Sequence, residues 1–299
     1  MINKEGKYVL EKPLEETILL DKLTPEIARI TLNRPEKHNA LLPPDSFLEA
    51  GRKVTMAAND DDVKVIIIRG AGESFCTGDD LNVAPYEAFG GGPGVKPPQR
   101  ARLKGFQELM NGFIRVLTFC PKVIICQVHG WCIAGGLWFV LPSDITIAAE
   151  TARFAHREQR IGFAGLDSGT LLLHILTIGY KRTREWLLTG RALSAQEAKE
   201  WGLINAVVPD DKLEDETMRW AKAIAMQAGD GLVIGKTHTQ ICLDMLGLSG
   251  SVGAGYMAHS FFTNIKWSPD EFNFLNVRNK KGITNTFKIR ENRWGELGF

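Results

Sequence analysis

Runs of β-branched apolar residues alternate with stretches of helical length, and this alternation constrains the fold more than any other feature of the sequence. The segment Val63–Arg69 is almost continuously apolar, as expected for a strand buried on both faces of a sheet. The stretches from Asp45 to about Asn59 and from Gln107 to about Leu117 are long enough for crossover helices. This alternation favours an α/β fold with a mostly parallel sheet. The predicted strands are Ile27–Leu32, Val63–Arg69, Val123–Val128 and Ile145–Ala149.

The chain becomes predominantly helical after about residue 170. Leu171–Leu176 and Arg184–Leu188 have the apolar character of buried helices. Ser194 and Glu197 form a capping box, which predicts a short helix that ends near Gly202.

A C-terminal helical region is expected beyond this helix. It begins with an amphipathic helix from Glu214 to about Ala228 and continues past Gly231. We expect this later part to be interrupted at Gly235, Gly247, Gly250, Gly253 and Gly255. The predicted division is a core of residues 1–215 and a C-terminal helical region with an aromatic, basic tail, residues 216–299.

The composition is that of a soluble globular protein without a strong electrostatic field. Hydrophobic residues make up 44% and charged residues 24% of the 299 residues, and the net charge is +1. This balance predicts neither nucleic acid nor an anionic membrane as a partner. The N-terminus lacks the apolar core of a signal peptide, and no apolar run approaches the roughly 20 residues of a membrane helix. We therefore expect a cytoplasmic protein.

The five cysteines lack CxxC spacing and lie mostly in apolar runs. This pattern favours buried thiols in a reducing compartment over disulfides or a metal site. Cys76 and Cys132 flank the candidate site described next, but no histidine and carboxylate follow at a recognisable spacing. We expect neither a cysteine nucleophile nor a metal.

Three short segments carry the chemistry expected of this chain: Ser74–Leu81, Val128–Val140 and Phe154–Gly162. The first two contain glycine turns after predicted strands, where the backbone N–H groups of Asp79 and Gly135 can point at one substrate oxygen. Two such donors form an oxyanion hole. The side-chain carboxylate of Asp79 would repel an oxyanion unless it points away.

The third segment supplies Glu158, a candidate general acid or base. Asp167 is a second candidate, with a helix N-cap as the alternative role for its side chain. The Gly- and Pro-rich stretch Glu87–Pro98 is predicted to be a loop, which either closes over a substrate or is a surface insertion.

These segments, in this order and spacing, resemble the crotonase (enoyl-CoA hydratase/isomerase) superfamily over roughly residues 20–265. The matching segments are Asn33–Leu41, Gly72–Leu81, Val128–Gly136, Asp144–Ala149, Phe154–Gly162 and Leu188–Pro209. The resemblance implies a β-β-α spiral core, a helical C-terminal region, and trimers that often pair into hexamers. It also implies an acyl-CoA thioester substrate whose carbonyl oxygen accepts from the backbone N–H groups of Asp79 and Gly135. Coenzyme A is then part of the substrate, and no separate cofactor is expected.

The resemblance further implies where coenzyme A binds. The segment containing His38, Ala40 and Leu41 would line its groove. In the tail, side chains would lie near the adenine end, in the same or a neighbouring subunit; these are Lys280, Lys281, Phe287 and Arg290.

The sequence departs from the family pattern at Trp138. Hydratases of this family use two glutamates, of which the second matches Glu158 and the first falls at position 138. Because tryptophan cannot carry the proton, one carboxylate at Glu158 resembles instead the Δ3,Δ2-enoyl-CoA isomerases. Asp167 lies near the second carboxylate of dienoyl-CoA isomerases, and Asn82 replaces a usual basic residue.

The expected function is that of an enzyme of the enoyl-CoA hydratase/isomerase type, with isomerisation the better match. Trp138 and the Gly- and Pro-rich loop leave open an alternative, a C–C hydrolase or lyase that acts on a cyclic or aromatic-derived acyl-CoA. In that setting Trp138 would pack or form a wall for a bulky acyl group. A non-catalytic scaffold that binds acyl-CoA is the third possibility.

Overall fold

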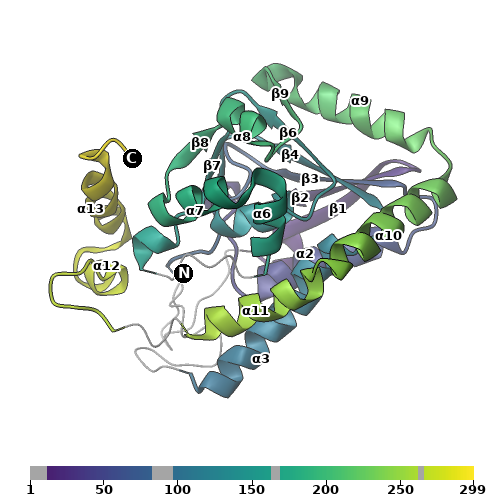
Figure 1. Cartoon of the computed structure of the whole chain (residues 1–299). Coiled ribbons are helices and arrows are strands. Elements are labelled where there is room, and N and C mark those ends of the chain that lie inside the picture. Colours follow the sequence, from purple (N-terminus) through teal and green to yellow (C-terminus); the bar gives the residue numbers. More distant parts are fainter. Residues whose placement is uncertain (1–11, 83–96, 163–168, 262–265) are drawn as a thin grey trace.

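The computed structural model describes residues 12–82, 97–162, 169–261 and 266–299. Its centre is a six-stranded sheet in the order β1-β2-β3-β4-β6-β9 (Figure 1). β1 runs antiparallel to β2, and the other neighbours are parallel, as the strand–helix alternation predicts. The strands are β1 Ile18–Thr24, β2 Ile27–Leu32, β3 Val65–Gly70, β4 Val123–Val128, β6 Ile145–Ala149 and β9 Ala206–Val208.

The start of β3 differs slightly from the prediction. The strand begins at Val65 rather than Val63, because Val63 N donates to Asp60 O at 3.1 Å and thereby closes a turn. Side chains of β3 alternate between two cores: Ile66 and Ile68 enter one, Val65 and Ile67 the other. Burial on both faces explains why apolar residues run through the strand without alternation.

Helices cover both faces of this sheet. α2 (Asp45–Ala58) contributes Phe47 and Val54 to the larger core, and α9 (Leu213–Ala225) packs Leu213 against the smaller one. The predicted boundary between residues 215 and 216 therefore falls inside a helix that covers the sheet.

A second, three-stranded sheet produces the spiral. It consists of β5 (Trp131–Ile133), β7 (Arg153–Ala155) and β8 (Ala192–Ser194), in that order. β5 follows β4 after only two residues, so the chain passes directly from one sheet into the other. A bridge between Cys76 and Cys132 joins β5 to the segment that follows β3.

The helical stretch before β4 is longer than predicted. It starts at Gln99 rather than near Gln107 and runs through α3 (Gln99–Leu109), the π-helical η3 (Met110–Ile114) and α4 (Arg115–Thr118). Its first turn is polar, so the sequence shows no apolar periodicity there and the start of the helix is not predicted. In the structure, the backbone N–H of Arg102 donates to Pro98 O and starts the helix.

Two predictions about the later helices need correction. Leu176 and Leu188 are exposed, so their helices are buried on one face only. Of the glycines expected to interrupt the C-terminal region, only Gly247 (φ 95°) separates two helices; the others lie inside α10 or α11. The remaining helices are α1 Leu14–Thr17, α5 Leu137–Val140, α6 Leu171–Ile178, α7 Tyr180–Thr189, α8 Ala195–Trp201, α10 Gly229–Met245, α11 Leu248–Phe261, α12 Phe274–Lys281 and α13 Ile283–Gly295.

α10 and α11 extend along one side of the molecule, and α12 and α13 lie beyond α7 (Figure 1). Among the described residues, no single helix combines the length and apolar composition needed to cross a membrane. Helices α10 and α11 meet both criteria only when taken as a pair, and the pair is bent by 59°.

Candidate active site

The first of the two predicted donor turns, Gly78–Asp80, is held in place by the segment that contains Leu41. Leu41 N donates to Gly78 O at 2.8 Å, and Asp80 N donates to Leu41 O at 2.7 Å. Since the residues on either side of Asp79 make this parallel bridge, the N–H of Asp79 itself points away from Leu41.

Gly135 lies in the first turn of the short 3-10 helix η4 (Ala134–Gly136), where backbone N–H groups lack partners within the helix. A Cβ on Gly78 would lie 3.1 Å from Gly135 N, so the two turns approach too closely for a side chain there. Gly78 also has φ 80°, and Ala134 has φ 51°, a conformation that is strained for alanine. The backbone at this junction is thus held in an unusual shape next to both predicted donors.

The side-chain carboxyl group of Asp79 lies beside Gly135. Asp79 Oδ1 lies 3.4 Å from the position that a Cβ on Gly135 would occupy, and the Phe47 ring borders the same position at 2.8 Å. Burial first, and then the negative charges of Glu158 and Asp80, raise the pKa of Asp79 to about 7. Protonation of this side chain near neutral pH therefore relieves part of the repulsion anticipated for its ionised form.

Glu158 lies just after β7, at the N-cap of the 3-10 helix η5 (Gln159–Ile161). Its Oε2 lies 2.6 Å from Nδ1 of His156, which is fully buried, while 18% of the Glu158 side chain is exposed. The Glu158 carboxylate thus contacts a buried imidazole on the side of the protein interior, and part of its side chain remains exposed to solvent.

His156 belongs to a buried ring cluster. Its ring centroid lies 5.5 Å from that of His174 and 6.3 Å from that of Trp186. The Trp186 indole N–H donates to the backbone oxygen of Arg191 at 3.0 Å.

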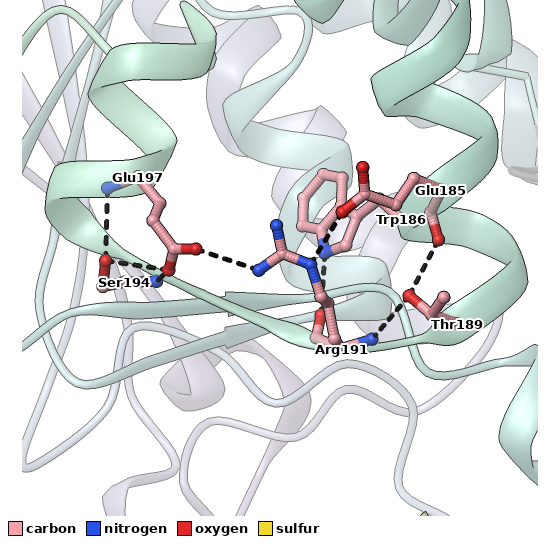
Figure 2. Close-up of polar contacts among 6 residues, drawn as sticks. All are labelled: Glu185, Trp186, Thr189, Arg191, Ser194 and Glu197. Atoms are coloured by element: carbon pink, nitrogen blue, oxygen red, sulfur yellow. Dashed lines mark hydrogen bonds and ion pairs between the residues drawn. The ribbon is translucent and has the colours of Figure 1, made fainter. Parts of the chain in front are cut away.

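The Arg191 guanidinium bonds Glu185 of α7 and Glu197 of α8, at 2.9 and 3.0 Å (Figure 2). Glu197 also completes the predicted capping box with Ser194, which confirms that prediction. This network joins α7, β8 and α8 into a support for the ring cluster behind Glu158.

Trp138 is 95% buried on α5 and forms an aromatic wall with Phe47, at a centroid distance of 5.1 Å. Phe113 packs on the other side of Phe47, at 5.2 Å. Within the described parts of the chain, the Trp138 indole N–H has no hydrogen-bond acceptor.

The other predicted site residues are distributed unevenly. Ala40 and Leu41 are buried beside the Asp79 turn, whereas His38 is exposed. Lys281 is exposed at the end of α12, and Phe287 packs against Phe274 inside the helix pair. Asp167, and most of the loop Glu87–Pro98, lie outside the described residues.

The C-terminal helices contact both site loops, which sequence reasoning missed. Arg278 of α12 donates to Leu81 O at 2.8 Å, two residues after Asp79. Glu291 of α13 pairs with Arg157 at 3.0 Å, one residue before Glu158. No local pattern signals such contacts, because the partners lie more than 130 residues apart in the chain.

The buried cysteines near the site are unsuited to act as nucleophiles. Burial raises the pKa of Cys76 to about 12 and that of Cys132 well above its ordinary value, so neither thiolate is favoured. In the portion of the chain that the structure describes, no three His, Cys, Asp or Glu side chains gather as metal ligands.

The fold and these motifs define a family. The family model for enoyl-CoA hydratase/isomerase matches residues 23–264. The chain belongs to this family, within the crotonase superfamily, and is therefore an enzyme that processes acyl-CoA.

Individual relatives agree with this assignment. The chain is 31% identical, over 72% of its length and 78% of the relative's, to 1,2-epoxyphenylacetyl-CoA isomerase of Escherichia coli (strain K12). It is 28% identical to an enoyl-CoA hydratase from Mycobacterium smegmatis, with a TM-score of 0.80 and coverage of 93% and 94% of the two chains. An enoyl-CoA hydratase/isomerase from Xanthobacter autotrophicus Py2 is 30% identical, with a TM-score of 0.78 and coverage of 93% and 98%.

Proposed function

We propose that this enzyme isomerises an unsaturated acyl-CoA through an enolate. The thioester oxygen accepts hydrogen bonds from Asp79 N and Gly135 N, and Glu158 removes the proton whose loss forms the enolate. The observation that carries the proposal is the close approach of the two glycine turns. If Gly78 had a Cβ atom, that atom would lie only 3.1 Å from the backbone nitrogen of Gly135. Each donor contributes about 3–4 kcal/mol to enolate stabilisation, by the cost of removing one elsewhere.

Trp138 favours isomerisation over hydration. A hydratase of this family would need a second glutamate at this position to hold and activate water. The buried indole and Phe47 instead form an apolar surface, 5.1 Å between ring centroids, with no carboxylate at position 138 to activate water. The relative named an epoxyphenylacetyl-CoA isomerase supports the same reaction class.

The aromatic wall also favours a bulky, ring-containing acyl group. Trp138, 5% exposed, would offer its ring to an apolar group, with the fully buried rings of Phe47 and Phe113 as its support. This keeps open the second candidate, C–C cleavage of a cyclic or aromatic-derived acyl-CoA, which the same assay distinguishes by its products.

The assay follows 3-hexenoyl-CoA, 2-hexenoyl-CoA and a cyclic β-keto-CoA thioester by chromatography and mass spectrometry. We expect conversion of 3-hexenoyl-CoA to the 2-enoyl isomer, reduced about 10²- to 10⁴-fold in Glu158→Gln. Glu200→Gln, an exposed exchange of the same type on α8, is the matched control and should retain full activity. Hydrated or cleaved products would select the other reaction types. Binding of thioesters without turnover would select the non-catalytic scaffold.

We also propose a trimer or a dimer of trimers. Exposed apolar side chains along α10 support this, because an isolated soluble helix seldom presents so many; they are Ile234, Ile241, Met245 and the adjoining Leu246. Light scattering of the purified protein gives the mass, and a monomer would contradict the proposal.

A further inference from the structure

The second carboxyl group of the site comes from the first donor turn. Trp138 occupies the position where a second acid would follow Gly136, but the carboxyl of Asp79 lies beside Gly135, with Oδ1 3.4 Å from the place of a Cβ. Asp79 therefore brings a carboxyl group, as well as a backbone N–H, to the junction of the two glycine turns. Sequence reasoning assigned a role only to the backbone.

The surroundings of this side chain explain its protonation. Phe47 lies against Gly135 and is backed by Trp138, so an apolar wall borders the carboxyl. The charged and titratable groups around Asp79 are Glu158, Asp80 and the Cys76 thiol. Asp80 pairs with Arg34 at 3.2 Å, and of the two neighbouring carboxylates Glu158 raises the pKa of Asp79 more, so we assign Glu158 as its proton partner.

We propose that the Asp79 side chain is the second proton carrier of this enzyme, a neutral acid that protonates the enolate formed by Glu158. This inference rests on the proposed isomerisation. Glu158 takes a proton from the α carbon of the 3-enoyl thioester, and the C–H electron pair enters the dienolate. Asp79 then delivers its proton to the γ carbon, which leaves Asp79 ionised and Glu158 protonated. Transfer of the proton from Glu158 to Asp79 restores the starting state, so atoms and charges balance.

The pair fits the general behaviour of two carboxyl groups that share a site, in which one pKa is raised and one proton is shared. With a pKa of about 7, a large share of the Asp79 side chain is protonated at neutral pH and is still able to give up its proton. Its protonation also removes the negative charge that would oppose an oxyanion at Gly135.

Asp79→Asn tests the proposal, because it keeps the backbone N–H and the side-chain shape but removes the transferable proton. We expect kcat for 3-hexenoyl-CoA to fall about 10²- to 10⁴-fold, with KM changed less than about threefold. The decline of wild-type kcat above about pH 7 should disappear in the variant. Asp61→Asn, an exposed exchange of the same type, is the control.

Exchange of the α hydrogen of 3-hexenoyl-CoA with D₂O separates the two steps. Asp79→Asn should retain this exchange, which needs only Glu158, while Glu158→Gln loses it. Thermal unfolding and calorimetric binding of hexanoyl-CoA verify that Asp79→Asn is folded, and Asp79→Ala provides a second variant. Turnover that is unchanged or faster in Asp79→Asn would overturn the role of Asp79 alone. Activity retained in Glu158→Gln would instead overturn the proposed function beneath it.

Discussion

His156 Nδ1 lies 2.6 Å from Glu158 Oε2, and the two side chains differ sharply in exposure, 0% against 18%. The imidazole therefore contacts the carboxylate from the protein interior. The two atoms are not aligned as a hydrogen bond, but a protonated imidazole at this distance would attract the carboxylate, fix its rotamer and leave its other oxygen for the substrate. His156 is thus a positioning residue that acts through Glu158.

Replacement of His156 should slow proton transfer. We expect His156→Ala to reduce kcat roughly 10- to 100-fold, the equivalent of a charged hydrogen bond of about 1.5–3 kcal/mol. His156→Gln keeps a donor and should recover part of this loss, with KM near that of the wild type in both variants. Steady-state kinetics on 3-hexenoyl-CoA measures the effect. Equal losses in the two variants would show that packing, not hydrogen bonding, is the contribution of this side chain.

Asp79 should make stability depend on pH. Because its pKa is raised to about 7 in the folded protein from an ordinary value of 3.8, the folded state binds the proton more tightly. The stabilisation is complete below about pH 4 and is lost as pH rises through about 7, with a slope of at most about 1.4 kcal/mol per pH unit. Urea unfolding from pH 4 to 8 should show this decline in the wild type and a flatter curve in Asp79→Asn. Parallel curves would contradict the raised pKa.

Trp138 should tolerate phenylalanine better than alanine. Truncation to alanine leaves a cavity beside Phe47 and should cost about 3–5 kcal/mol of unfolding free energy. Trp138→Phe keeps a ring and removes an indole N–H that has no acceptor among the described residues, so its cost should be much smaller. Trp220→Phe is the contrast, since that indole N–H donates to Glu216 at 2.8 Å. Urea unfolding compares the three, and equal costs for Trp138→Phe and Trp138→Ala would count against an aromatic wall.

Loss of the capping box should weaken the support of the site without touching the reacting groups. Ser194→Ala removes the acceptor for Glu197 N and should cost about 1 kcal/mol, or roughly 2–4 °C in Tm. Ser194→Thr retains the hydroxyl and serves as the control. Calorimetry measures Tm, and KM for the thioester should not change; a KM effect would mean that the cap influences substrate binding directly.

Several features of this protein follow from the sequence alone. β-branched runs such as Val65–Ile68 favour strands because they pack well on a pleated surface that is buried on both sides. Ser194 and Glu197 start a helix through bonds that span three residues. The order and spacing of the glycine turns indicated the family, since these motifs are local and each depends on a few neighbouring residues. The ends of helices are less well predicted. The helix that begins at Gln99 has a polar first turn, so apolar periodicity does not indicate where it starts.

The tertiary structure decided what surrounds each reactive group. The carboxyl of Asp79 and the Phe47 ring both lie beside Gly135, where the segment after β3 bridges to β5 through Cys76 and Cys132. Likewise, His156 and Trp186 become neighbours through the pairing of β7 with β8. Burial and proximity between distant segments set a pKa and choose a hydrogen-bond partner, and no local pattern encodes either. The sequence therefore determined which groups are available, and packing determined which of them can exchange a proton.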